Sequence, residues 1–82
     1  MPTTNKIEMI QVHSSNIQSM GYDKENSILV VKFAAGWTYE YANVTDEVYA
    51  LLAQAAKLGV SVSTVFNPLI RDHPETFPYR KV

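Results

Sequence analysis

Hydrophobic residues in the first half of the chain alternate with polar ones, which is the period of β-strands. In the stretch from Ser27 to Phe33, alternation places Leu29, Val31 and Phe33 on one face. The opposite face is also largely apolar, so we expect this stretch to be a central strand. The same reasoning predicts strands in four stretches, at residues 7–12, 14–23, 27–33 and 37–44.

The hydrophobic period lengthens to three or four residues after Thr45, which is typical of an amphipathic helix. Thr45 can cap this helix, and Asp46 and Glu47 suit the positive end of its dipole. We expect the helix to end at Gly59. A second, short helix is predicted from Ser61 or Ser63 to Ile70, with Pro68 in its first turn or kinking it.

These elements predict an α+β domain: an antiparallel meander of three or four strands, with one long and one short helix packed on one face. The 82 residues suffice for one domain and not for two. We place that domain at residues 7–82, after a flexible lead-in at residues 1–6. The tail, residues 72–82, contains Pro74 and Pro78 and is expected to lie over the domain as extended chain.

Composition adds few constraints. The formal net charge of −1 argues against a protein held on nucleic acid by bulk charge, although residues 57–82 carry four basic side chains against two acidic ones. There is no cysteine, which excludes disulfides and thiolate chemistry. No apolar run approaches the ~20 residues of a membrane span, and residues 1–6 do not resemble a signal peptide. We therefore expect a soluble, cytoplasmic protein.

The chain holds few residues suited to catalysis. His13 and His73 are far apart in sequence and lack the spacing of metal ligands. Asp46 and Glu47 point about 100° apart on a helix, so they cannot flank a substrate. The three glycines stand apart and form no phosphate-binding loop. We expect a protein that is not an enzyme and that uses neither a metal nor a cofactor.

Aromatic and basic residues are the remaining candidates for function. Trp37, Tyr39 and Tyr41 share one face of a predicted strand, and the end of the chain interleaves aromatic with basic side chains. Rings beside cations are typical of single-stranded nucleic-acid binding, but the same residues also suit a core with arginine stems packed over it. The candidate ligand-binding residues are Arg71, Tyr79, Arg80, Lys81, Tyr39 and Tyr41.

The order of these motifs resembles a known family. "VHSSNIQSMGYD", "ILVVKFAAGWTYEYANV", "VYALLAQA", "FN", "IR" and "PYRKV" together are similar to the KTSC domain, found at the C-terminus of some lysyl-tRNA synthetases. The resemblance covers about residues 10–82. It implies a small protein of bacterial or phage origin, and the link to a synthetase suggests RNA binding. The matching positions are Ser15, Asn16, Gly21, Tyr22, Tyr39, Tyr41, Asn43, Val44, Tyr49, Phe66, Asn67, Ile70, Arg71, Tyr79 and Arg80.

Two hypotheses follow. In the first, the protein is a binding module that contacts RNA or a nucleotide-like anion through its C-terminal basic and aromatic residues. In the second, it is a protein-interaction or homo-oligomeric module that pairs through an exposed strand edge.

Overall fold

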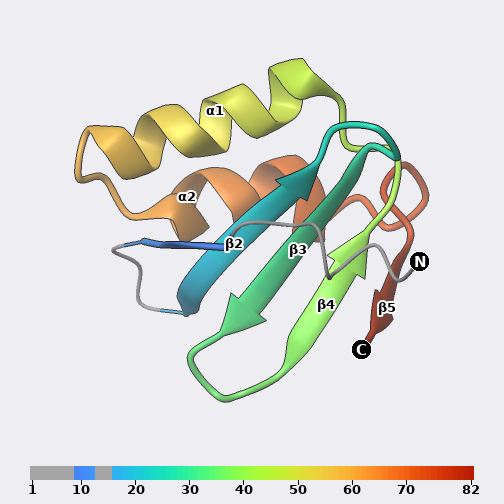
Figure 1. Ribbon diagram of the computed structural model, residues 1–82, viewed down its shortest axis with the longest axis horizontal. Coiled ribbons are helices and arrows are strands. Elements are labelled where there is room, and N and C mark those ends of the chain that lie inside the picture. The colour runs from blue at the N-terminus through green and yellow to red at the C-terminus, as the bar shows by residue number, and fades with distance from the viewer. Residues whose placement is uncertain (1–8, 13–15) are drawn as a thin grey trace.

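The computed structural model describes residues 9–12 and 16–82, and its framework is an antiparallel sheet whose strand order follows the chain (Figure 1). Helices lie on one face of this sheet, and the C-terminal strand forms one edge beside β4. The strands in the described residues are β1 (Ile10–Gln11), β2 (Ile17–Asp23), β3 (Ile28–Phe33), β4 (Thr38–Tyr41) and β5 (Tyr79–Lys81).

Strand register aligns two rows of side chains across the helix-facing side of the sheet. Because partners directly opposite each other point to the same face, each row continues from strand to strand. Both rows pass under the helices and end on the edge strand β5, and the first row also reaches Ile10 of β1. The first row is Met20, Val31, Tyr39 and Lys81, and the second is Tyr22, Leu29, Tyr41 and Tyr79.

The long helix α1 (Asp46–Lys57) is capped by Thr45, whose hydroxyl oxygen accepts a hydrogen bond of 3.3 Å from the Val48 amide. It ends before Gly59, which has a φ of +76° that suits glycine. A short helix, α2 (Val62–Phe66), continues into a turn of π-helix, η2 (Asn67–Arg71), with Pro68 in its first turn. The proline lacks an amide hydrogen, and at the start of a helix that loss costs little.

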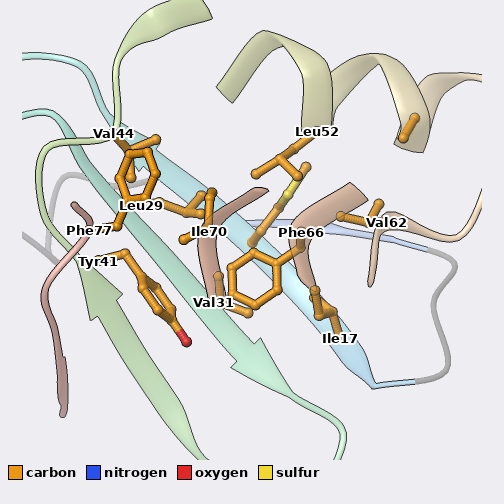
Figure 2. Packing of buried hydrophobic residues seen from close by; sticks show 12 residues of the cluster. Ile17, Leu29, Val31, Tyr41, Val44, Leu52, Val62, Phe66, Ile70 and Phe77 are labelled. Carbon is orange, nitrogen blue, oxygen red and sulfur yellow. The ribbon is translucent and has the colours of Figure 1, made fainter. Parts of the chain in front are cut away.

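The core lies between the sheet and the helices. β3 contributes Leu29 and Val31, and the helices contribute Leu52, Phe66 and Ile70, all at most 1% exposed. Figure 2 shows these side chains packed together, with Tyr41 at the edge of the cluster. A chain of this size builds only a thin core, so each large side chain contributes substantially to stability.

The sequence-based strand count needs a correction. The α+β class, the antiparallel meander and both helices are as predicted, but within residues 9–12 and 16–82 the sheet has five strands instead of three or four. The additional strand is β5, in the segment expected to be extended chain over the domain. It has three exposed residues after Pro78 and no hydrophobic alternation, so its pairing with β4 left no local signal. Residues 1–8 and 13–15, including Ile7, His13, Ser14 and Ser15, lie outside the described residues.

Candidate aromatic groove

The three aromatic residues of the β4 segment differ in burial although they share one face. Tyr41 is 4% exposed and belongs to the core, Tyr39 is half-buried, and Trp37 is 53% exposed. Figure 1 shows the cause: the start of β4 extends beyond the helices. Tyr41 therefore fits the interpretation of these aromatic residues as core, whereas Trp37 has the exposure that a ligand platform requires.

β5 adds an aromatic ring and a cation beside this row. Tyr79 lies opposite Tyr41, and its ring centroid is 5.6 Å from those of both Tyr39 and Tyr41. Lys81 lies opposite Tyr39 and places its Nζ 3.6 Å from the centre of the Trp37 ring. That distance is within the range of a cation–π interaction. Within the part of the chain that the structure describes, this edge of the sheet therefore presents a cluster of aromatic rings with a cation beside them.

Arg71 reaches the same place from the helical layer. It is the last residue of η2, directly after the fully buried Ile70, and buried Phe77 anchors the chain again six residues later. The loop between these two anchors also brings in Pro74. Together these side chains form an open groove of about 310 Å³, which we call the aromatic groove. Its lining residues are Phe33, Trp37, Tyr39, Tyr41, Arg71, Pro74 and Tyr79.

The aromatic groove raises the pKa of Tyr41 above the ordinary value for tyrosine. Burial raises the pKa of Tyr41 to about 12, and its neighbours Tyr39 and Tyr79 add to the rise. The Arg71 guanidinium acts in the opposite direction and lowers this pKa, because its charge favours the phenolate. At neutral pH the groove thus combines a neutral Tyr41 hydroxyl with the positive charge of Arg71.

Asp72 partly offsets the charge of Arg71. The Nε of Arg71 donates a hydrogen bond of 3.3 Å to Oδ1 of Asp72, and both side chains are about half exposed. Exposed pairs of this kind contribute only ~0.2–1 kcal/mol. The contact uses one of the five N–H groups of the guanidinium, so the others stay available for an anion.

Arg80 lies on the opposite side of the sheet. Its Nε and Nη2 each lie 3.0 Å from Oε1 of Glu40, whose side chain is only 7% exposed. Of the six predicted ligand-binding residues, the structure thus brings five together and separates Arg80. The separation follows from strand geometry, since Arg80 stands between Tyr79 and Lys81 and must point the other way.

A second groove adjoins the aromatic groove. It has a volume of about 320 Å³, and Arg71 and Phe33 line both grooves. We call it the polar groove; its lining residues are Asn16, Phe33, Ala34, Ala35, Asn67 and Arg71.

The sequence interpretation did not select Phe33 and Pro74, which line the aromatic groove, or Ala34, Ala35 and Asn67 of the polar groove. Phe33 carried a usable signal, because it shares the face of Leu29 and Val31 but ends its strand. Asn67 also carried one, as part of the FN motif that resembles the family. Pro74, Ala34 and Ala35 carried none, since their positions depend on how loops meet the sheet.

Within residues 9–12 and 16–82, no group of three or more histidine or acidic side chains is arranged to hold a metal ion. In the same residues, no helix has the length and apolar character needed to cross a membrane. His73 contacts Glu75 at 3.2 Å on the surface.

Comparison with known proteins places this geometry in a family. The sequence model of the KTSC domain family matches residues 13–72. An uncharacterised protein from Stutzerimonas stutzeri is 39% identical over 62 residues, which is 76% of this chain and 87% of that protein. A protein from Tsukamurella paurometabola is 38% identical over 63 residues, which is 77% of this chain and 94% of that protein.

A solved structure extends the similarity to nearly the whole chain. The crystal structure of a KTSC domain protein from Yersinia pestis superposes with a TM-score of 0.72 at 31% identity, covering 93% of this chain and 97% of that one. The family match ends at residue 72, so β5, with Tyr79 and Lys81, follows the matched segment.

Proposed function

The chain belongs to the KTSC domain family, and we propose that it acts in the cytoplasm as a non-enzymatic module that binds single-stranded RNA in the aromatic groove. The observation that carries this proposal is the meeting of Tyr39, Tyr41 and Tyr79 with Arg71 in one open groove. Rings that stack on bases, next to a cation that pairs with phosphate, are the shared features of single-strand binding sites.

The composition of the groove favours unpaired bases over a duplex. Single-stranded bases expose their faces and stack on aromatic side chains, whereas in an RNA helix those faces are covered. Trp37 and Tyr79 are both more than half exposed and therefore accessible to a base. Stacking contributes ~1–3 kcal/mol per base, so rings supply most of the affinity in this proposal.

Charge makes a smaller contribution. Among the residues that the structure describes, Arg71 and Lys81 are the cations beside the groove. Each phosphate contact to a single strand gives a slope of about −0.7 in log K against log salt. Two contacts predict a slope of about −1.4, which means roughly a sevenfold loss of affinity between ~50 and ~200 mM salt.

The test is a fluorescence-anisotropy titration of a labelled single-stranded RNA at those two salt concentrations. Arg71→Gln should weaken binding and reduce the salt slope by about 0.7. Tyr79→Ala should weaken binding roughly tenfold, with the slope unchanged, because it removes a stacking surface and no charge.

Lys57→Gln is the matched control, because it removes one exposed cation from the last turn of α1, on a different part of the molecule. It should bind RNA like the wild type. Equal losses in Lys57→Gln and Arg71→Gln would show nonspecific attraction and overturn the groove assignment. No binding at either salt concentration would overturn the RNA proposal.

One observation favours a second candidate function, a module that pairs with another protein or with its own copy. β5 is an edge strand with three exposed residues, and edge strands are templates for further pairing. A molecular mass that rises with concentration in light scattering, together with no RNA binding, would support this alternative.

A further inference from the structure

Arg71 stands where two grooves of similar size meet. The aromatic groove has a volume of about 310 Å³ and the polar groove about 320 Å³. Both lie on the helix-facing side of the sheet, since both include Phe33 and Arg71. A ligand that fills the aromatic groove can therefore extend past Arg71 into a second space of similar size.

The two grooves differ in chemistry. The aromatic groove offers tyrosine rings, whereas the polar groove is lined by Asn16 and Asn67 and by the small Ala34 and Ala35. The amide of an asparagine side chain both donates and accepts hydrogen bonds, which suits the edge of a base or a ribose hydroxyl. The alanines belong to the turn between β3 and β4 and leave the space open.

The guanidinium between them suits a phosphodiester. Its Nε is engaged by Asp72, and its remaining N–H groups lie in a plane that matches the oxygens of a phosphate. The Arg71 side chain is 53% exposed, so an anion can approach it without opening the core.

On the basis of the proposed function, we infer that the site binds two successive nucleotides of a single RNA strand, with the phosphate that joins them at Arg71. The first base stacks in the aromatic groove against Tyr79. The second nucleotide occupies the polar groove, where Asn67 contacts it. The minimal ligand is a dinucleotide.

The test compares adenosine 5′-monophosphate with the dinucleotide ApA by calorimetry on the full chain. The monophosphate carries more negative charge than the single phosphodiester of ApA, so charge alone favours the mononucleotide. We expect ApA to bind about tenfold more tightly, the factor that one additional good contact of ~1.4 kcal/mol supplies.

Two variants locate the second nucleotide. Ala35→Leu fills the polar groove and Asn67→Ala removes its amide, so each should abolish the advantage of ApA and leave mononucleotide binding unchanged. Ala50→Leu is the control, because it adds the same bulk at an exposed position of α1. Thermal melts of each variant verify that it is folded.

The outcomes separate this inference from the proposed function. Equal affinities for the two ligands, unchanged in Ala35→Leu, would overturn the two-nucleotide site while leaving the aromatic groove as a binding site. Failure of both ligands and of a longer RNA to bind would overturn the proposed function and this inference with it.

Discussion

Tyr41 belongs both to the hydrophobic core and to the lining of the aromatic groove. Its ring packs edge-on against Phe66 at 5.2 Å between centroids, and it also neighbours Tyr39 and Tyr79. Tyr79, which lies opposite Tyr41 on β5, is 54% exposed. Two adjacent tyrosines therefore have different tasks: one supports the fold, and the other is available to a ligand.

This difference predicts unequal effects on stability. Tyr41→Ala should lower the free energy of unfolding by ~3–5 kcal/mol, the range for truncating a large buried aromatic side chain. Tyr79→Ala should lower it by less than ~1 kcal/mol, as surface substitutions do. Urea denaturation of both variants measures the difference. Losses of similar size would mean that Tyr79 is also part of the core.

At the scale of elements, the ion pair between Glu40 and Arg80 fastens β5 to β4. The Glu40 carboxylate is buried on the side of the sheet away from the groove, and Arg80 is the partner that holds it from β5. This pair thereby fixes β5 beside β4, with the side chains of Tyr79 and Lys81 on the groove side of the sheet. In the binding mode that we propose, Arg80 therefore positions the groove and does not contact the ligand.

Arg80→Gln should destabilise the protein by ~1–3 kcal/mol, because it leaves a buried carboxylate without its charged partner. In the double variant with Glu40→Gln, part of that loss should be recovered, since the buried group is then neutral. Chemical denaturation of the two single variants and the double variant gives the coupling energy. Additive losses would show that the pair does not act as a unit.

The sequence predicted the elements with local signals. Alternation located β2, β3 and β4, and Thr45 with the stripe from Val48 to Ala55 located α1. It did not predict β5, because three exposed residues gain their strand structure only from pairing with Tyr39, Glu40 and Tyr41, about forty residues earlier. Pairing over such a separation has no signature in local periodicity.

The candidate site was partly predictable for the same reason. Residue types identified Arg71, Tyr39, Tyr41, Tyr79 and Lys81, which the structure brings together. Arg80 was selected by type as well, but its position between Tyr79 and Lys81 becomes informative only once that segment is known to be a strand. The polar groove depends on where the end of α2 meets the β3–β4 turn, and packing alone sets that.

For the whole molecule, tyrosine burial predicts loss of stability in alkali. Burial raises the pKa values of Tyr22, Tyr41 and Tyr49, that of Tyr41 to about 12. In the unfolded chain a tyrosine ionises near pH ~10. Because the raised pKa belongs to the folded state, this contribution to stability is complete below pH ~10 and is lost as pH rises towards ~12.

Denaturation midpoints measured from about pH 8 to about pH 12 should therefore fall above pH ~10. Tyr41→Phe should show a shallower fall than the wild type, because it has no hydroxyl to ionise at the most strongly shifted position. Absorbance of tyrosinate, recorded in the same samples, follows the ionisation itself. An identical fall in both proteins would contradict the assignment to Tyr41.

The position of Trp37 has an optical consequence. It is the single tryptophan of the chain, and it lies at the mouth of the aromatic groove with Lys81 over its ring. Its fluorescence originates at the groove and not in the core, so emission should respond to a stacked base or to displacement of Lys81. The protein thus carries an intrinsic probe at the surface where we propose that its ligand binds, and no label needs to be attached there.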